Sequence, residues 1–332
     1  MSDIVISSRI RLARNIAGFP FLSRASRHQR QVLETRIRDT ILASEIAPQV
    51  LYVDLDNAPE IDRLLLVERH LISKPHAAAE GARGVAVAED ETVAIMVNEE
   101  DHLRIQVLRS GLQLEEAWEQ ISRIDDRLES KLDFSFHQRF GYLTACPTNV
   151  GTGVRVSVML HLPALKLTGE IEKVFRAAKE MRLAVRGLYG EGTEATGDFY
   201  QISNQTTLGK SEQEIISEFR MSVVPKIVDY EYHARRMLLN DRTVALDDKV
   251  CRALGLLRSA RLLASDETLF LLSHLRMGVN LGRVKEIDVR TLNELFLLTQ
   301  PAHLQKIQGR KLEGDVRRAA RADYIRQRLN GN

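Results

Sequence analysis

The sequence predicts a mixed α and β domain followed by an all-helical region. Up to about Leu208, runs that alternate apolar and polar residues lie between helical stretches. Beyond Leu208, almost every segment has the apolar spacing of an amphipathic helix. The chain has 332 residues and is 44% hydrophobic, which is enough for one large domain or two smaller ones.

Charge and cysteine content exclude several classes of function. The net charge of +2 is too balanced for general attraction to nucleic acid, although the stretch from Arg310 to Arg328 is locally basic. Cys146 and Cys251 have no metal-binding spacing, which fits a reducing compartment. No secretory signal and no run of ~18 apolar residues is present. We expect a cytoplasmic protein that binds neither membrane nor nucleic acid directly.

The first expected strand is the segment VISSRIRLA, in which two kinds of side chain alternate. The apolar face expected in the core carries Ile4, Ile6, Ile10 and Leu12. The opposite face carries Ser7, Arg9 and Arg11. One face is therefore apolar and the other cationic.

Two further candidate strands place arginine on a face away from the core. The run TVAIM continues into VNEEDHLR, where strand parity groups Asn98, Glu100, His102 and Arg104. The run VRVSVMLHL places Arg155, Ser157, Met159 and His161 opposite a row of valines and leucines. A solvated sheet face is the alternative for any single strand. The planar fork of arginine matches phosphate oxygens in pairs, however, so three such strands favour a polyphosphate site.

The helices follow from period and capping. The segment LEEAWEQISRIDDRLESKL has one apolar stripe and is expected to pack on the sheet. In the C-terminal region, Asp247, Ser265 and Asp288 are expected to be N-caps. Pro225 is expected to end or kink the helix that begins near Ser211.

Known phosphate loops are absent from the sequence. The segment NQTTLGKS ends like a Walker A loop, but Asn204 stands where that loop begins with glycine. No G-x-G-x-x-G pattern joins a strand to a helix. Two glycine-rich segments, CPTNVGTGVR and RGLYGEGTEATGDF, each carry an arginine instead. A nucleotide would therefore be bound by arginine side chains.

Four segments in this order, VISSRIRLARN, VNEEDHLRI, ACPTNVGTGVR and RGLYGEGTEATGDFYQISN, resemble the ATP:guanido phosphotransferase (phosphagen kinase) family. The later segments RMGVNLGRV, TLNELFLLTQPAHLQK and DVRRA resemble its bacterial protein-arginine kinase branch. Metabolite kinases of the family carry a helical domain before the motif that here begins at Ser7. The resemblance implies an α+β fold. Residues 1–238 would be a catalytic domain with an antiparallel sheet flanked by helices, and residues 239–332 an all-α dimerisation domain.

The resemblance also implies residue roles. Glu100 and Glu191 would be the catalytic carboxylates that hold the acceptor guanidinium. The donor would be ATP, with Mg²⁺ held mainly by the nucleotide and no metal site on the protein. The nucleotide-binding residues would be Ser7, Ser8, Arg9, Ile10, Arg11, His70, Arg104, Arg155, Val156, Ser157, Val158, Met159, Arg186, Gly187, Leu188, Tyr189 and Gly190.

One further position has an implied role, and two positions depart from the family pattern. Cys146 would be a reactive accessory thiol beside the substrate and not a covalent nucleophile. Thr207 stands where metabolite kinases usually have an arginine. Of a phosphoarginine-sensing pattern RDxxRA, the chain keeps Asp315 and Arg318 but has Gly314 at the first position. Phosphoarginine sensing and a merely solvent-facing basic helix both stay open there.

The function implied is ATP-dependent phosphorylation of arginine side chains in proteins. The implied partners are protein substrates with exposed arginine, a second copy of the chain, an McsA-type activator, a Clp unfoldase and protease, and a stress-gene repressor. One alternative is a phosphagen kinase acting on free arginine or another guanidino metabolite. Another is an inactive regulatory protein that binds phosphoarginine. Glu100 argues against this second alternative, because a protein that only binds phosphoarginine needs no acceptor carboxylate.

Overall fold

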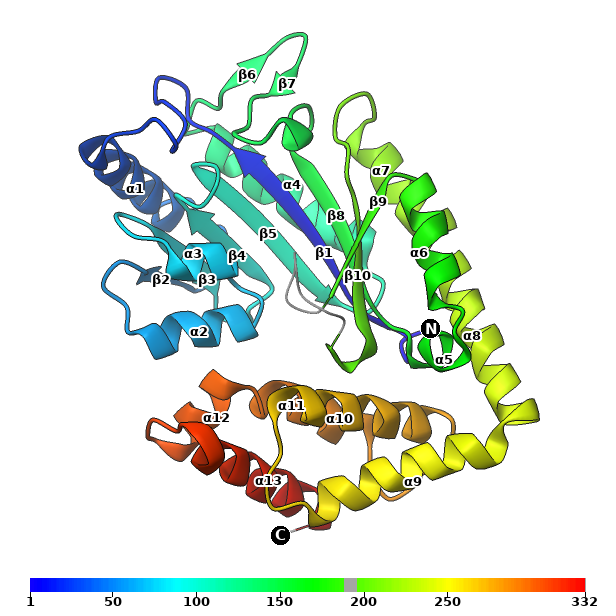
Figure 1. Ribbon diagram of the computed structural model, residues 1–332. Coiled ribbons are helices and arrows are strands. Elements are labelled where there is room, and N and C mark those ends of the chain that lie inside the picture. The colour runs from blue at the N-terminus through cyan, green and yellow to red at the C-terminus, as the bar shows by residue number, and fades with distance from the viewer. Residues whose placement is uncertain (188–195, 332) are drawn as a thin grey trace.

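The computed structural model describes residues 1–187 and 196–331, and its centre is one eight-stranded antiparallel sheet (Figure 1). In spatial order the strands are β2 (Val50–Asp54), β3 (Gly84–Ala88), β4 (Val93–Val97), β5 (Leu103–Ser110), β1 (Val5–Arg14), β8 (Val154–His161), β10 (Phe199–Asn204) and β9 (Leu183–Arg186). A small separate hairpin consists of β6 (Phe136–His137) and β7 (Gly141–Tyr142). The expected antiparallel sheet is confirmed.

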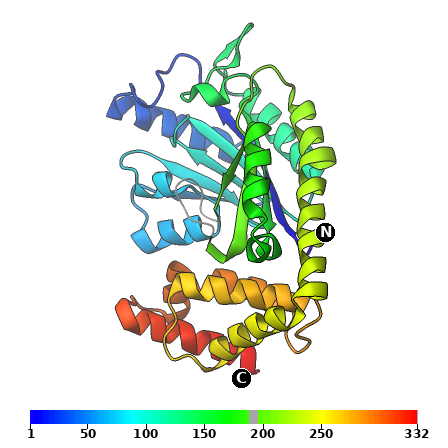
Figure 2. The same cartoon turned by 45° about the vertical axis from the view of Figure 1, so that its right-hand side comes forward.

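Helices flank this sheet and then form the whole C-terminal region. Those in the sheet-containing part are α1 (Arg27–Leu42), α2 (Glu60–Glu68), α3 (Lys74–Ala78), α4 (Leu114–Glu129), α5 (Pro163–Thr168), α6 (Ile171–Glu180), α7 (Glu212–Glu218) and α8 (Val224–Asp241). The C-terminal helices are α9 (Thr243–Ser259), α10 (Ser265–Asn280), α11 (Val289–Leu298), α12 (Pro301–Gln308) and α13 (Gly314–Asn330). The long α8 runs along one side of the sheet-containing part and leads into α9 (Figure 2).

The main core lies on the sheet face that α4 covers (Figure 1). Ile10 and Leu12 of β1, together with Ile121 of α4, are among its buried residues. The amphipathic stripe predicted for α4 is confirmed, because its Leu114, Ile121, Ile124 and Leu128 are buried. Burial of this apolar surface is the main source of stability for the sheet and the helices that flank it.

The opposite face is only partly covered. A second apolar cluster joins Val67 of α2 and Ala77 of α3 to Val85, Ala94 and Met96 of β3 and β4. This cluster covers the β3–β4 part of the sheet. The same face of β5, β1, β8 and β10 carries polar side chains and is where the candidate site lies.

One residue of the first strand was assigned to the wrong face. The pairing of β1 with β8 shifts register between Val5 and Ser7, as at a β-bulge. Val5 and Ile4 are both buried in the core, whereas Ile6 lines a pocket on the polar face with Ser7. A bulge inverts the parity of the residues before it, so strict alternation could not predict this.

The C-terminal region is helical, as predicted, and α8 and α9 meet at Arg242. Asp288 caps α11 by accepting a hydrogen bond from the Thr291 amide at 2.6 Å, which confirms that N-cap. The other two N-caps were predicted wrongly. Helix α9 begins four residues before Asp247, whose carboxylate accepts from Arg283, and α10 takes Ala264 as its N-cap.

Pro225 lies in the first turn of α8, directly after a π-helical turn, so the predicted interruption of the helix is confirmed. Among residues 1–187 and 196–331, no helix is both long and apolar enough to cross a lipid bilayer.

Candidate active site

The strand register brings arginines from distant parts of the sequence onto one face. Arg11 of β1 lies directly opposite Arg155 of β8, and Arg9 lies opposite Ser157. Arg104 of β5 lies opposite Ala13, two positions along β1 from Arg11. Like charges directly opposite in a sheet repel and are destabilising. We call Arg9, Arg11, Arg104, Arg155 and Arg186 the arginine cluster.

Arg11 is the most deeply buried member of the arginine cluster. Its side chain is only 7% exposed, and its Nε and Nη2 atoms have no hydrogen-bond partner in the described part of the chain. Burial, followed by the charges of Arg9, Arg104, Arg155 and Arg186, holds the pKa of Arg11 well below its ordinary value. Among the described residues, the charges that act on Arg11 are all positive, and a buried cation in such surroundings is costly. An anion with several oxygens would supply both the missing charge and the missing acceptors.

Arg9 has the same electrostatic surroundings but one protein partner. Burial, together with the charges of Arg104, Arg155 and Arg186, lowers its pKa to about 9. Its Nη2 donates to the side-chain oxygen of Gln201 on β10. Arg186 is paired with Gln201 across β9 and β10, so this glutamine lies between two arginines.

Two polar residues of β10 were missed by the sequence analysis. Besides Gln201, Ser203 accepts a long hydrogen bond of 3.4 Å from Nη2 of Arg155. Both lie on the polar face, whereas Ile202 between them is buried in the core. The alternation in FYQISN is the signal that could have found them.

His70 lies at the edge of the arginine cluster in an unusual backbone conformation. Its φ is +59°, a left-handed value that is uncommon for a residue with a side chain. Its carbonyl oxygen accepts from Nε2 of Gln106 on β5 at 2.7 Å. Burial and the charge of Arg9 lower the pKa of His70 to about 4, so its ring is neutral at neutral pH.

The acidic turn between β4 and β5 differs from the extended strand that was predicted. Val97 ends β4, and residues 98–102 form a hairpin loop in which Asn98 has a φ of +59°. Asn98 donates its side-chain amide to the carbonyls of Arg30 and Ala82, away from the arginine cluster. The predicted grouping of Asn98 and His102 with Arg104 on one strand face is therefore wrong, because the tight turn breaks the period of two.

Glu99 and Asp101, the other two acids of this turn, have structural partners. Glu99 accepts from Arg104 at 2.7 Å and from the Ser73 hydroxyl at 2.6 Å. Burial alone would raise the pKa of Glu99, but Arg104 and these hydrogen bonds outweigh it and lower the pKa to about 2. Glu100 is exposed at the tip of the turn. The turn therefore anchors one arginine and presents a second carboxylate.

Asp101 connects this turn to the segment that contains Cys146. Its buried carboxylate accepts from the Ala145 amide at 2.7 Å and from the Asn15 side chain at 2.6 Å. Cys146 is partly exposed, and its sulfur lies 3.0 Å from the Thr148 hydroxyl. The Cys146 segment and Glu100 are thus fixed to the same turn.

A pocket of about 330 Å³ adjoins the arginine cluster at Arg9. Ser7, Ser157, Met159 and His70 line it, so these four predicted residues are brought together. Its volume is within the range of small-molecule sites. Of the arginine cluster, only Arg9 is part of the described lining.

Other predicted residues lie elsewhere. The side chains of Ser8, Ile10, Val156 and Val158 point into the core on the opposite face. Ser8 donates to the carbonyl oxygen of Gly111 at 2.7 Å, which fixes the loop before α4. Gly187 directly follows β9, and Leu188, Tyr189, Gly190 and Glu191 lie outside the described residues.

Thr207 and the C-terminal pair have other partners. The Thr207 hydroxyl is hydrogen-bonded to the carbonyls of Thr148 at 3.0 Å and Val150 at 2.7 Å, so it fixes the Cys146 segment. Asp315 and Arg318 form an exposed ion pair of 3.2 Å at the start of α13. Within the described residues, no group of three His, Cys, Asp or Glu side chains is placed to hold a metal ion.

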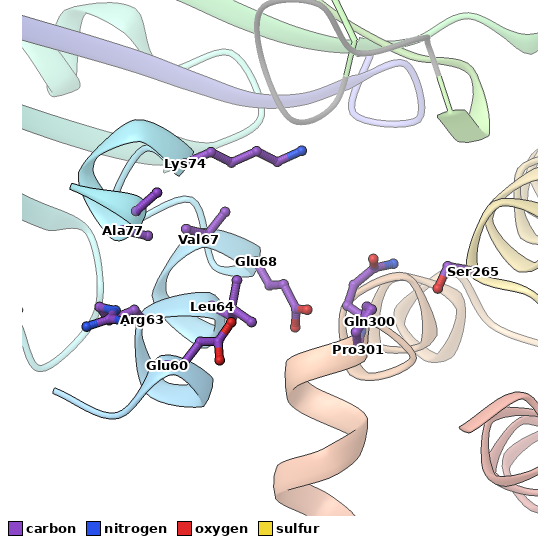
Figure 3. A pocket seen from close by; sticks show the side chains of 11 residues that line it. Glu60, Arg63, Leu64, Val67, Glu68, Lys74, Ala77, Ser265, Gln300 and Pro301 are labelled. Carbon is purple, nitrogen blue, oxygen red and sulfur yellow. The ribbon is translucent and has the colours of Figure 1, made fainter. Parts of the chain in front are cut away.

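A second cavity, of about 470 Å³, separates α2 and α3 from the start of α12 (Figure 3). Its described lining includes Leu64, Val67 and Pro301 but no member of the arginine cluster. The arginine cluster, with the pocket at Arg9, is therefore the candidate active site.

The fold and this arginine-lined sheet face define a phosphotransferase. Residues 33–234 match the family ATP:guanido phosphotransferase, C-terminal catalytic domain, and the chain belongs to this family. Residues 243–332 match the protein-arginine kinase McsB C-terminal domain, which characterises the protein-arginine kinase branch of the family. The resemblance stated from the four sequence segments is confirmed.

Several relatives that match over almost the whole chain are named protein-arginine kinase. Those from Halothermothrix orenii and Symbiobacterium thermophilum are 48% and 51% identical, with 99% of this chain and 93% and 94% of theirs covered. The relative from Clostridium acetobutylicum is 43% identical over 99% of this chain and 96% of its own.

Solved structures of metabolite kinases share the catalytic fold. A lombricine kinase matches with a TM-score of 0.61 and 28% identity over 70% of this chain and 67% of its own. The duplicated taurocyamine kinase of Schistosoma mansoni, with bound transition state analog components, matches with a TM-score of 0.63 and 28% identity. That match covers 70% of this chain and 34% of the taurocyamine kinase chain.

Proposed function

We propose that this chain is an ATP-dependent protein-arginine kinase. The observation that carries the proposal is the buried guanidinium of Arg11, which has four like-charged neighbours and two nitrogen atoms without a hydrogen-bond partner among the described residues. A triphosphate supplies the charge and oxygens that this group requires. The protein-arginine kinase relatives and the matching C-terminal domain support a protein as the acceptor.

In this proposal the arginine cluster holds the triphosphate and stabilises the charge that develops on the transferred group. Mg²⁺ neutralises further phosphate charge and is held mainly by the nucleotide. His70, which is neutral, lies against the nucleotide beside Arg9. Ser7, Ser157 and Met159 form part of the pocket that receives the rest of the molecule.

The acceptor lies on the side of Glu100. A guanidinium has a pKa above ~12 and a delocalised lone pair, so it is a poor nucleophile until it is aligned and loses a proton. The Glu100 carboxylate aligns two of its N–H groups and accepts that proton. The guanidinium nitrogen then forms a bond to the γ-phosphorus, the bond to the bridging oxygen breaks, and ADP leaves. Glu191 is proposed as a second carboxylate.

Asp101 and Thr207 act as positioning residues, because both hold the segment that carries Cys146. Cys146 is proposed as an accessory thiol beside the acceptor. From the family resemblance we further propose a cytoplasmic homodimer that works with an McsA-type activator and marks proteins for a Clp protease in the stress response. Asp315 and Arg318 are proposed as a remnant of a phosphoarginine-sensing site.

The test is phosphoarginine formation. The purified chain is incubated with Mg-ATP and either an unfolded protein or free arginine, and acid-labile phosphoarginine is measured by mass spectrometry. The proposal predicts transfer to the protein, with at least a 100-fold loss in Glu100→Gln. The control Glu89→Gln changes an exposed carboxylate in the turn between β3 and β4 and keeps full activity. Transfer to free arginine alone would indicate a metabolite kinase, and transfer to neither, both without and with an added McsA-type activator, would overturn the proposal.

A further inference from the structure

The pocket beside Arg9 has walls from two domains. On the catalytic side it is lined by Leu108, Met159 and Phe199, which come from three strands of the sheet. On the other side it is lined by Asn293, Phe296 and Leu297 of α11, in the C-terminal domain. We propose that the C-terminal domain completes the nucleotide site and that Phe296 is a wall for the nucleobase. This inference rests on the proposed ATP-binding function.

The distribution of charge orients a nucleotide in this pocket. Arg9 is the one member of the arginine cluster in its described lining, and Arg11 and Arg155 lie further along the same sheet face. A triphosphate on those arginines therefore leads back through Arg9 into the pocket. Beyond Arg9 the apolar side chains of Met159 and Phe296 suit a flat heterocyclic base. The lining also contains Arg69 and Glu91, whose charges pair with each other.

Phe296 is held in place from the catalytic side. Its ring contacts Phe199 of β10 edge to face, with 4.9 Å between the centroids and 90° between the planes. Phe199 is only 5% exposed, so it is a fixed support. Edge-to-face aromatic pairs are favourable beyond the area they bury.

Asn293 is fixed to the sheet by a buried arginine. Its side-chain oxygen accepts from Nε of Arg276 at 3.1 Å. Arg276, of α10, is 2% exposed, and its Nη1 also contacts Nδ1 of His161 at 2.9 Å. His161 is the last residue of β8, the strand that carries Met159 and Arg155. The α11 wall is thereby tied to a strand of the nucleotide site.

A second tie lies at the end of α2. Glu68 extends from α2 toward the start of α12 (Figure 3) and accepts from the amides of Ala302 and His303 at 2.7 and 2.9 Å. It also accepts from Nδ1 of His303 at 2.7 Å, while Arg69 donates to the other ring nitrogen at 3.2 Å. A carboxylate at a helix N-terminus is stabilised by the helix dipole. This interdomain contact lies two residues from His70. Both sides of the pocket therefore depend on the position of the C-terminal domain.

The test compares two ligands with the full-length chain. ATP contacts both the arginine cluster and the proposed wall, whereas inorganic tripolyphosphate lacks the base and ribose. Phe296→Ala is expected to weaken ATP binding roughly tenfold, the effect of losing an aromatic contact to a base, and to leave tripolyphosphate binding within about twofold. The control Phe270→Ala removes the same side chain from α10, where it is 46% exposed and contacts His274 outside this pocket. It is expected to change neither affinity.

Each outcome bears on a different statement. Unchanged ATP binding in Phe296→Ala would overturn the inference while the proposed function stands. A wild-type chain that binds neither ligand would overturn the proposed function and the inference with it. If Phe296→Ala loses both ligands through misfolding, the inference is tested with Phe296→Leu, because leucine keeps apolar packing against Phe199. Its ATP binding is expected to fall severalfold with tripolyphosphate binding unchanged, and unchanged ATP binding would overturn the inference.

Discussion

Replacing Glu99 by glutamine tests the ion pair that anchors Arg104 at the acidic turn. The pKa of Glu99 is about 2 in the fold, against an ordinary value of 4.5. A carboxyl with that difference contributes roughly 3 kcal/mol to the free energy of unfolding at pH 7. Because the pKa is lower in the folded state, this contribution is complete above pH 4.5 and is lost as the pH falls toward 2. Glu99→Gln should therefore be less stable by roughly 3 kcal/mol at pH 7.

The assay is urea unfolding of wild type and Glu99→Gln at pH 7 and pH 3. At pH 3 the difference between the two proteins should shrink to less than half of its value at pH 7, because the unfolded-state carboxyl is then mostly protonated. Glu89→Gln removes an exposed carboxylate from a nearby turn and should stay within ~0.5 kcal/mol of wild type at both pH values. A difference that is the same at pH 7 and pH 3 would refute the electrostatic explanation.

Two further predictions concern buried ionisable side chains. Asp125→Ala should lower the free energy of unfolding by roughly 3–5 kcal/mol in a urea titration, because Arg14 is 2% exposed and would lose its only carboxylate partner among the described residues. Asp126→Ala, an exposed neighbour, should cost less than ~0.5 kcal/mol, and equal effects would contradict this reasoning. Burial lowers the pKa of His76 to about 4, so between pH 6.5 and 4 the unfolded chain binds a proton that the folded chain does not. On acidification, the free energy of unfolding of wild type should then fall by ~1.4 kcal/mol per pH unit more than that of His76→Gln. This variant keeps an N–H donor for the Gly84 carbonyl. Parallel pH profiles of the two proteins would contradict the prediction.

Period-two alternation predicted the polar face of the catalytic sheet well. Arg9, Arg11 and Arg155 share one face because each lies at an alternate position of a regular strand. The prediction failed where the backbone leaves that period. The bulge before Ser7 moved Ile6 to the polar face, and the hairpin turn separated Asn98 from Arg104.

Contacts between domains could not be predicted from local patterns. Phe296 and Phe199 meet because the chain folds back after almost a hundred residues, and neither segment alone indicates a pocket. The tie between Glu68 and the start of α12 joins residues that are 234 positions apart, more than twice that separation. In both cases the family resemblance indicated that the C-terminal segment belongs to a branch of the kinases, but not that it borders the pocket beside Arg9.

The N-cap predictions separate local from long-range causes in the same way. Asp288 caps α11 through its own neighbour three residues on, so sequence was sufficient. Asp247 has the right composition for a cap but lies inside α9, where its carboxylate pairs with Arg283. Tertiary pairing thus outweighed the local preference.

The most direct test of the central claim uses calorimetry to measure two properties of Arg11→Met, its affinity for ATP and its thermal stability. The account predicts that removing this buried, unpartnered charge raises the stability of the nucleotide-free protein by about 1–4 kcal/mol. It also predicts that ATP affinity falls roughly 100-fold, because charge-assisted bonds to phosphate are lost. Arg36→Met, at an exposed position on α1, should change neither quantity. Wild-type ATP affinity in Arg11→Met would contradict the account.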